Sequence, residues 1–307
     1  MKVGVLMGGV SSEREVSLLS GEEIMKYMDK EKYEVFPIVI DSKDEVLEKV
    51  RGLDFVFLAL HGAFGEDGSI QALLESISTT YSGCGVLTSA LCMSKKQSKR
   101  ILKAESIITP PGFIVNENKE LSIELIETLG YPMVVKPNNG GSSVGTFIVS
   151  NRKALMESIE KAFKYDEQLL IEKYLEGEEY TISVLNGEVL PILQIKAKGE
   201  FFDYSSKYLD GGAEEVAAKL PKVLEEEMNK IAIACWEIFD CRAYVRIDII
   251  VHEGVPYVLE LNTLPGMTKN SLFPRSASFA GMEYSVLLDN IIKASQRDIY
   301  KDREHFC

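Results

Sequence analysis

Residues 244–271 read Tyr-Val-Arg-Ile-Asp-Ile-Ile-Val (244–251), His-Glu-Gly-Val (252–255), Pro-Tyr-Val-Leu-Glu-Leu-Asn (256–262) and Thr-Leu-Pro-Gly-Met-Thr-Lys-Asn-Ser (263–271). Two alternating runs rich in β-branched residues flank a turn at Gly254, a pattern typical of an antiparallel hairpin. Folding the chain about Gly254 sets Asp248 opposite Glu260, and Arg246 opposite Asn262. Because side chains alternate along a strand, all four share one face of the sheet.

These four side chains suit a hard cation. Two carboxylates and an amide oxygen form the oxygen-only ligand set that Mg²⁺ prefers, and an arginine beside them favours phosphate chemistry. The alternative is a solvated sheet face on which the acids and the arginine pair through water. The Pro265-Gly266 turn that follows can direct backbone N–H groups toward a ligand, which favours the metal site.

Composition limits the classes of function. A chain of 307 residues with 46% hydrophobic content can bury a large core, and its length suggests two or three domains. The net charge of −13 argues against unassisted binding to nucleic acid or to an anionic membrane. The five cysteines have no zinc-like spacing and suggest free thiols in a reducing cytosol. With no signal-peptide pattern and no run of about 18 apolar residues, the sequence predicts a cytoplasmic protein.

The chain opens with alternating strand and helix patterns. Strands are expected at 2–7, 33–40 and 53–60, which predicts a parallel sheet. The intervening helix is expected at 13–28, with its apolar face formed by Val16, Leu19, Ile24 and Tyr27.

Two polar, glycine-rich loops follow these strands. The first, 8–15, leads into a helix N-terminus, which favours an anion, although it lacks the Gly-x-Gly-x-x-Gly spacing. Glu15 in this loop suits either a substrate contact or a capping box with Ser12, and the spacing leaves both open. The second loop, 61–68, begins with His61 at the carboxyl end of a strand, where open α/β sheets bind ligands. A lone histidine in such a loop is more often structural.

The middle of the chain offers a second cluster of cations. A helix is expected over 88–104, and its lysines and arginine are interpreted mainly as a solvated face. Further on, Lys136 ends a short strand and faces the Gly/Ser-rich loop 138–145, an arrangement that suits a triphosphate. It is not a Walker A motif, because the lysine precedes the glycines and no helix follows them. Taken alone, it is equally an ordinary hairpin.

Taken together, the motifs resemble those of the D-alanine:D-alanine ligase family of the ATP-grasp superfamily, over essentially the whole chain. The motifs that carry the resemblance are Gly-Gly-x-Ser-x-Glu-Arg-Glu-Val-Ser (8–17), Leu-His-Gly with Gly-Glu-Asp-Gly (60–68), Gly-Ser-Ser-Val-Gly (141–145), Ile-Glu-Lys-Tyr-Leu (171–175), Lys-Tyr-Leu (207–209), Arg-Ile-Asp (246–248) and Glu-x-Asn-Thr-x-Pro-Gly-Met-Thr (260–268) with Ser271-Leu272. The resemblance implies an α/β protein in which a parallel-sheet, Rossmann-like domain (1–90) precedes two α+β subdomains (91–175 and 176–307) that form an ATP-grasp fold.

The resemblance also implies roles for individual residues. ATP would be bound by Lys95, Lys136, Ser143, Glu172, Lys173, Leu175, Glu179, Phe201, Lys207 and Ile250. Two Mg²⁺ or Mn²⁺ ions would be bound by Asp248, Glu260 and Asn262. Glu15 and His61 would contact the first D-alanine, and Ser271 and Leu272 the second. A set formed by Glu15, Ser142 and Tyr208 would close the site, while Arg246 and the N–H of Gly266 would stabilise the oxyanion.

The implied reaction is ATP-dependent joining of two D-alanines through a D-alanyl phosphate, for peptidoglycan synthesis, by a cytoplasmic homodimer. The sequence departs from the family pattern at Ser94, at Ser205 and at 216–218, positions that bear on how loops are anchored. Three alternatives stay open: a ligase that makes a D-alanyl-D-lactate or D-alanyl-D-serine product, a carboxylase-type ATP-grasp enzyme, and a catalytically silent nucleotide-binding sensor.

Overall fold

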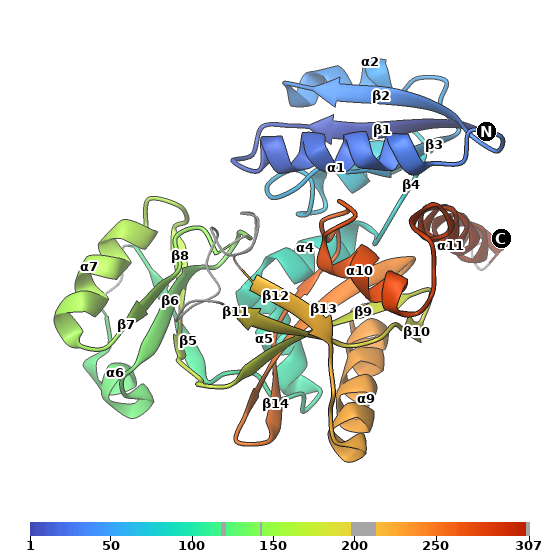
Figure 1. Ribbon diagram of the computed structural model, residues 1–307. Helices are drawn as coiled ribbons and strands as arrows, with labels where there is room; N and C mark the ends of the chain where they lie inside the picture. The colour runs from blue at the N-terminus through green and yellow to red at the C-terminus, as the bar shows by residue number, and fades with distance from the viewer. Residues whose placement is uncertain (118–120, 142, 198–212, 305–307) are drawn as a thin grey trace.

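In the computed structural model, which describes residues 1–117, 121–141, 143–197 and 213–304, the strands form three sheets (Figure 1). The N-terminal sheet has the order β2-β1-β3-β4 and is parallel throughout, as the sequence predicts. Its elements are β1 (Lys2–Gly8), α1 (Arg14–Tyr27), β2 (Glu34–Ile40), the 3₁₀ turn η1 (Lys43–Glu45), α2 (Val46–Lys49), β3 (Phe55–Leu58), α3 (Ser69–Ser76) and β4 (Thr80–Tyr81).

Helix α1 packs on this sheet with part of the expected face. Ile24 is fully buried, but Leu19 is 58% exposed and lines a cavity, so the prediction that Leu19 faces the core is wrong. The apolar side chain of Leu19 therefore faces this cavity instead of the sheet.

The middle sheet is antiparallel, with the order β5-β8-β6-β7. Its elements are β5 (Gly112–Asn116), α6 (Ile123–Leu129), β6 (Met133–Pro137), β7 (Phe147–Val149), α7 (Arg152–Ala162) and β8 (Gln168–Lys173). Side-chain caps begin both helices: Ser122 Oγ accepts from Leu125 N, and Asn151 Oδ1 accepts from Ala154 N.

The third sheet is also antiparallel, with the order β12-β11-β9-β13-β14 and with β10 beside β9. Its elements are β9 (Glu178–Leu185), β10 (Glu188–Val189), β11 (Leu193–Ala197), β12 (Ala213–Ala217), α9 (Lys222–Ile238), β13 (Tyr244–His252) and β14 (Val255–Asn262), followed by α10 (Leu272–Phe279) and α11 (Tyr284–Glu304).

The predicted hairpin is confirmed as β13 and β14, with Arg246 paired to Asn262 and Asp248 to Glu260. Glu253 and Gly254 both have positive φ angles, +50° and +79°, as a tight two-residue turn requires. A register shift after Asp248 lies outside these two pairs and leaves them on one face.

The stretch 88–104 forms two helices where one was expected. Helices α4 (Val86–Met93) and α5 (Lys95–Ala104) are separated at Ser94, whose backbone is extended. Both helices pack near β14 of the third sheet. Lys95 is buried and Lys99 nearly so, and neither therefore belongs to the solvated face expected for most of the basic residues in this stretch.

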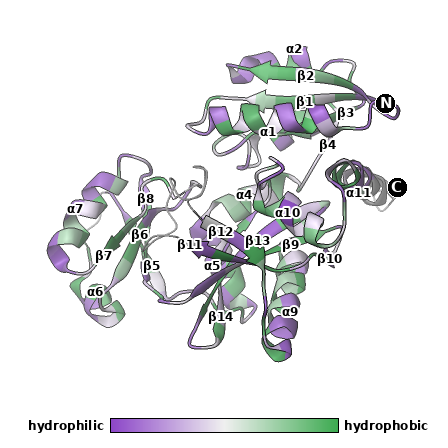
Figure 2. Cartoon of the chain, viewed as in Figure 1, coloured by the Kyte–Doolittle hydropathy of each residue, from purple (hydrophilic) through white to green (hydrophobic). Residues whose placement is uncertain are grey.

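The described residues form three hydrophobic clusters. Those of the middle and third sheets each stay close to one sheet, but the N-terminal sheet shares its cluster with α10 and α11. Strands β2 and β13 are mainly apolar, whereas α7 and α9 mix polar and apolar residues (Figure 2). Within the described ranges, no helix is both long and apolar enough to cross a bilayer.

Candidate active site

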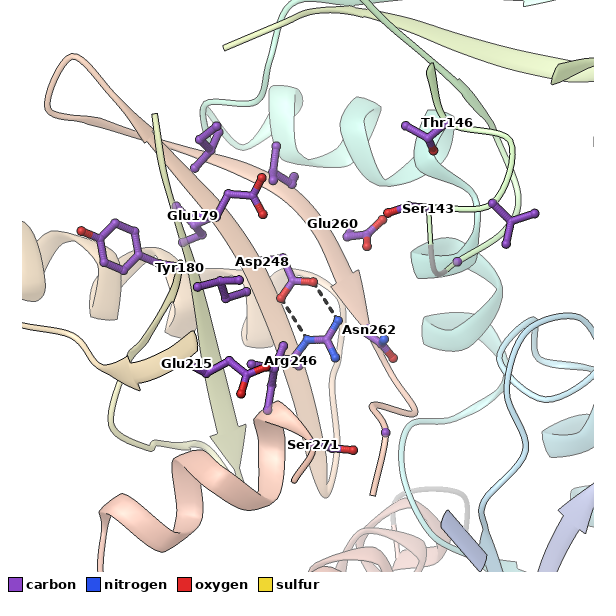
Figure 3. A pocket seen from close by; sticks show the side chains of 18 of the residues that line it. Ser143, Thr146, Glu179, Tyr180, Glu215, Arg246, Asp248, Glu260, Asn262 and Ser271 are labelled. Atoms are coloured by element: carbon purple, nitrogen blue, oxygen red, sulfur yellow. Dashed lines mark hydrogen bonds and ion pairs between the residues drawn. The ribbon is translucent and has the colours of Figure 1, made fainter. Parts of the chain in front are cut away.

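A cavity of about 1370 Å³ is lined by strands of the middle and third sheets and by α1 and the loops of the N-terminal sheet. The hairpin forms one wall, and the glycine-rich loop that carries Ser143 and Thr146 lies across from Glu260 (Figure 3). Polar loops of the N-terminal sheet close a further side through residues such as Glu13 and His61. The cavity therefore brings together groups that are far apart in the sequence.

Asp248 is held from two sides. Arg246 donates two hydrogen bonds to it, Nε to Oδ1 at 2.9 Å and Nη2 to Oδ2 at 2.8 Å (Figure 3). Thr181, which pairs with Asp248 across β9 and β13, donates from Oγ1 to Oδ1 at 2.7 Å. The carboxylate is thus fixed in orientation by a bidentate arginine and by the Thr181 hydroxyl.

Glu260 and Asn262 line the same cavity on the neighbouring strand. Glu260 Oε2 lies 3.4 Å from Lys95 Nζ, and Lys95 also donates to the carbonyl oxygen of Gly140 at 2.6 Å. Lys95 therefore connects helix α5, the glycine-rich loop and the hairpin.

The donor set of the hairpin fits a hard cation. Two carboxylates and an amide oxygen face one cavity, and all of them are oxygen ligands. In the described part of the chain, no three Asp, Glu, His or Cys side chains form a metal site by themselves. A cation at the hairpin would therefore take further ligands from the Asn262 amide and from the oxygens of a bound phosphate.

Lys136, Glu172 and Lys99 form a buried charged cluster. Each lysine makes an ion pair with a different oxygen of Glu172, whose side chain is 3% exposed. Burial acts to raise the pKa of Glu172, but Lys136 and Lys99 outweigh it and hold that pKa below its usual value. Burial likewise acts to lower the pKa of Lys136, but the nearby carboxylates, Glu172 foremost, outweigh it and raise the pKa. Both Lys136 and Glu172 are therefore charged at neutral pH.

The residues expected at the adenine and ribose that the structure describes also line the cavity: Glu172, Lys173, Leu175, Glu179 and Ile250. The ammonium of Lys173 donates to the carbonyl oxygens of Gly130 and Tyr131, at 3.3 and 3.1 Å. The ammonium group of Lys173 therefore anchors the segment just before β6.

Gly266, Ser271 and Leu272 lie together at the start of α10. A Cβ at Gly266 would meet Ser271 Oγ at 3.0 Å, so this close turn suits glycine. Ser271 Oγ shares a hydrogen bond of 2.7 Å with Thr268 Oγ1. This fixes the hydroxyl at the edge of the cavity.

The structure corrects the expectation for Glu15. The side chain of Glu15 is 86% exposed and lies beside Arg14, outside the cavity, and α1 begins without a side-chain cap. The capping box is therefore absent, and the Glu15 carboxylate does not reach the cavity. Successive residues of a helix are rotated by about 100° about its axis. Two residues that are two positions apart therefore point to nearly opposite sides.

Glu13 occupies the cavity instead. It is 7% exposed, and a Cβ at Gly62 would lie 2.8 Å from Glu13 Oε2. The adjacent turn explains this orientation. Ser11 Oγ accepts from Glu13 N at 3.2 Å and donates to the carbonyl oxygen of His61 at 2.7 Å, which fixes the turn against the His61 loop. The motif 8–17 contains both Glu13 and Glu15. Where α1 begins decides which of the two carboxylates faces the cavity.

His61 lies on the cavity wall and is buried. Its Nε2 lies 3.3 Å from Ser20 Oγ, and its Nδ1 lies 3.8 Å from Glu66 Oε1. Glu66 in turn accepts from Gly62 N at 3.0 Å. Glu66 lines the cavity too, although the motif 60–68 that contains it carried no predicted role for this residue.

Four expected site residues lie outside the described residues: Ser142, Phe201, Lys207 and Tyr208. The other expected residues, Glu15 excepted, border the cavity, and their chemical roles stay predictions.

Two family models match the chain. A model for the N-terminus of D-Ala-D-Ala ligases matches residues 2–50 and 43–84, and a model for the C-terminus matches residues 106–293. Among curated proteins, the chain is 53% identical over 295 residues to a D-alanine–D-alanine ligase of Clostridium botulinum, covering 96% of this chain and 98% of the relative. It is 52% identical over 296 residues to D-alanine–D-alanine ligase B of Clostridium perfringens, with the same coverage.

Solved structures agree. The crystal structure of a D-alanine–D-alanine ligase from Bacillus anthracis complexed with ATP superposes with a TM-score of 0.91 at 43% identity, over 98% of this chain and 99% of that one. The structure of VanG D-Ala:D-Ser ligase from Enterococcus faecalis superposes with a TM-score of 0.85 at 28% identity, over 96% and 99%. The similarity therefore extends across all three sheets.

Proposed function

The chain belongs to the D-alanine:D-alanine ligase family, and we propose that it joins two D-alanines into D-alanyl-D-alanine while ATP is converted to ADP and phosphate. The product would serve peptidoglycan synthesis. One observation carries the proposal: Arg246, Asp248, Glu260 and Asn262 share one face of a hairpin inside a cavity that Lys136 also lines. Oxygen ligands and fixed cations in one cavity suit phosphoryl transfer.

In the first step, a carboxylate oxygen of the first D-alanine attacks the γ-phosphorus of ATP. The bond from that phosphorus to the bridging oxygen breaks, ADP leaves and D-alanyl phosphate forms. Mg²⁺ or Mn²⁺ held by Asp248, Glu260 and Asn262 would neutralise phosphate charge. Lys95 and Lys136 would bind phosphate oxygens, for which their buried ammonium groups are suited.

The first D-alanine would lie against the N-terminal loops. We assign Glu13, in place of Glu15, to its ammonium group, because the Glu13 carboxylate is buried on the cavity wall. His61 would lie beside it, with its ring oriented by Ser20 and Glu66.

In the second step, the free amine of the second D-alanine attacks the acyl carbonyl carbon. The carbon–oxygen bond to phosphate breaks, phosphate leaves, and the proton lost by the amine passes to the departing phosphate. Arg246 and the Gly266 N–H would stabilise the oxyanion of the tetrahedral intermediate. Ser271 and Leu272, at the N-terminus of α10, would receive the carboxylate of the second D-alanine.

A homodimer and a cytoplasmic location are part of the same proposal. Their support is membership of the family and, for the location, the cysteine content of the sequence.

The test measures ADP and phosphate release from Mg²⁺-ATP with D-alanine, L-alanine, D-lactate and D-serine in turn. We expect release with D-alanine and formation of the dipeptide. A preference for D-serine as the second substrate would instead assign the chain to the activity named for the Enterococcus faecalis relative. Nucleotide binding without release under any condition would support the sensor alternative.

A further inference from the structure

Lys99 lies directly behind the part of the cavity expected to hold adenine. It is one helical turn after Lys95 on α5, so both lysines project from the same side of the helix. Lys95 reaches the cavity, whereas Lys99 does not line it and instead ion-pairs with Glu172 Oε1. Lys99 Nζ also lies 3.3 Å from the carbonyl oxygen of Pro110. With its side chain only 13% exposed, Lys99 faces Glu172 from the protein side.

The second oxygen of Glu172 is paired with Lys136, and both of these residues line the cavity. A triphosphate in the cavity offers Lys136 a stronger anionic partner than one carboxylate. When Lys136 turns to phosphate, Glu172 Oε2 becomes available to a ligand and Lys99 is left as the counter-ion at Oε1. A buried carboxylate without a counter-ion tends to take up a proton.

We propose that Lys99 is a positioning residue for nucleotide recognition, which keeps Glu172 ionised and oriented so that Glu172 accepts a hydrogen bond from the 6-amino group of adenine. The inference rests on the proposed function, in which Lys136 binds phosphate and Glu172 faces the base. An ionised carboxylate can only accept hydrogen bonds, whereas a protonated one also donates. Adenine presents an amino donor at position 6 and guanine an oxygen acceptor. The charge of Lys99 thereby acts on the choice of base without touching it.

Among the charged groups around Glu172, Lys99 is the one that decides whether Glu172 stays ionised when Lys136 binds phosphate. Lys136, on β6, and Lys99, on α5, are the cations that lower the pKa of Glu172, while Glu260 on β14 and Glu179 on β9 act to raise the pKa of Lys136. Burial lowers the pKa of Lys99, and contact with Glu172 acts in the opposite direction. Without Lys99, the pKa of Glu172 should rise, because burial raises it and one of its two opposing cations is gone.

The test compares Lys99→Met with Lys103→Met, which makes the same change at an exposed lysine of the same helix. We expect the KM for ATP of Lys99→Met to rise by about tenfold or more at pH 7, because a hydrogen bond accepted by an ionised carboxylate is lost when Glu172 takes up a proton. The kcat at saturating ATP should change much less. Direct titration with ATP by calorimetry gives the same comparison without turnover.

The pH profile separates this role from a merely structural one. Between pH 6 and 8.5 the KM for ATP of Lys99→Met should fall as pH rises, because Glu172 ionises again, whereas the unaltered protein should show a flat profile. The preference for ATP over GTP should also shrink in Lys99→Met. In the double variant with Glu172→Gln, the pH dependence should disappear because no carboxyl group remains to titrate.

An unchanged ATP affinity and a flat profile in Lys99→Met would overturn the inference while leaving the proposed ligase activity intact. Absence of activity in the unaltered protein would overturn the proposed function, and the calorimetric comparison would still decide the role of Lys99. Lys99→Gln, which is closer in shape and polarity, serves as a second variant if Lys99→Met does not fold. A pH-independent loss of ATP affinity in both variants would also contradict the proposal.

Discussion

Two glutamates at the start of α1 show how a shift of two residues decides whether a carboxylate reaches the cavity. Glu13 precedes the helix and is held inward by the Ser11 turn. Glu15 lies within the first turn of the helix and points to solvent. The two residues are chemically identical, so they form a matched pair for testing the role of the site.

Replacing Glu13 by Gln should raise the KM for D-alanine by on the order of tenfold to a hundredfold, because a buried charge that faces an ammonium group is lost. The control, Glu15→Gln, keeps the same change in composition at an exposed position and should behave as the unaltered protein does. Steady-state kinetics at saturating ATP give both values. A larger effect from Glu15→Gln would return the assignment to Glu15.

Asp248 and Glu260 carry the charge of the proposed cation site. Asp248→Asn and Glu260→Gln should each lower kcat by on the order of a hundredfold or more, since even the outer partners of metal ligands cost about 10- to 100-fold. Both side chains line a cavity, so the unfolding midpoint should change little. Glu253→Gln, in the exposed turn of the same hairpin, should retain full activity. Near-normal turnover in either site variant would remove that residue from the site.

At the scale of secondary structure, the break between α4 and α5 places two lysines. The first two N–H groups of α5 find their acceptors on Asn138, whereas those of Gln97 and Ser98 donate to the carbonyl oxygen of Ser94. Lys96 N donates to Asn138 Oδ1 at 2.8 Å, and Lys95 N donates to the carbonyl oxygen of Asn138 at 3.1 Å. Asn138 also donates from Nδ2 to Ser94 Oγ at 3.2 Å. A residue after β6 thus caps a helix that begins 43 positions earlier in the chain.

Replacing Asn138 by Ala should lower the free energy of unfolding by about 1–2 kcal/mol, the usual cost of a lost cap. The affinity for ATP should fall as well, because the start of α5 orients Lys95 toward the cavity. Chemical denaturation and ATP titration measure the two effects. Asn151→Ala, which removes the cap of α7 away from the cavity, should cost similar stability with unchanged ATP affinity. Equal losses of affinity in both variants would contradict this role for Asn138.

At the scale of the whole molecule, the two ends of the chain pack together. Helix α11 lies beside the N-terminal sheet (Figure 1), and its residues share that sheet's hydrophobic cluster. Asp289 on α11 is buried, accepts a hydrogen bond from Tyr33 Oη and lies 2.7 Å from Lys293 Nζ. Burial acts to raise the pKa of Asp289, but its hydrogen bonds and the nearby lysines outweigh it and lower the pKa.

The lowered pKa of Asp289 predicts how stability depends on pH. Because the pKa is lower in the folded protein than in the unfolded chain, the stabilisation is present above the unfolded value, about 3.9, and is lost as pH falls through the folded value. Asp289→Asn should therefore be less stable by about 1–2 kcal/mol at pH 7, and the difference should shrink below about pH 4.

Chemical denaturation of Asp289→Asn and of the unaltered protein between pH 3 and 8 measures the difference. Glu283→Gln, an exposed change just before the same helix, is the control and should leave the midpoint nearly unchanged at every pH. A stability difference that stayed constant down to pH 3 would mean that packing, and not the charge of Asp289, is responsible.

The sequence by itself determined the hairpin, the pairing of its four polar residues and the class of the N-terminal sheet. A short turn at Gly254 and the alternating pattern predict the pairs of Asp248 with Glu260 and of Arg246 with Asn262, whereas the register shift between Asp248 and Ile249, which lets Val258 be buried, appears only in the structure. These signals are local, so no knowledge of distant contacts is needed. The motifs also indicated the family, and the residues outside the described part of the chain, together with the domain boundaries at 90 and 175, stay predictions.

Only the tertiary structure decided which of several equivalent local patterns is used. Glu13 and Glu15 fit the same motif, and the contact between Ser11 and the His61 loop selects Glu13. The sequence of a basic helix predicts a solvated face, and only the position of Glu172 on β8 shows that Lys99 lies in a buried ion pair. The break at Ser94 depends on Asn138, which is distant in sequence. Local spacing cannot reveal such choices, because burial and capping by residues far along the chain set the energy of each side chain.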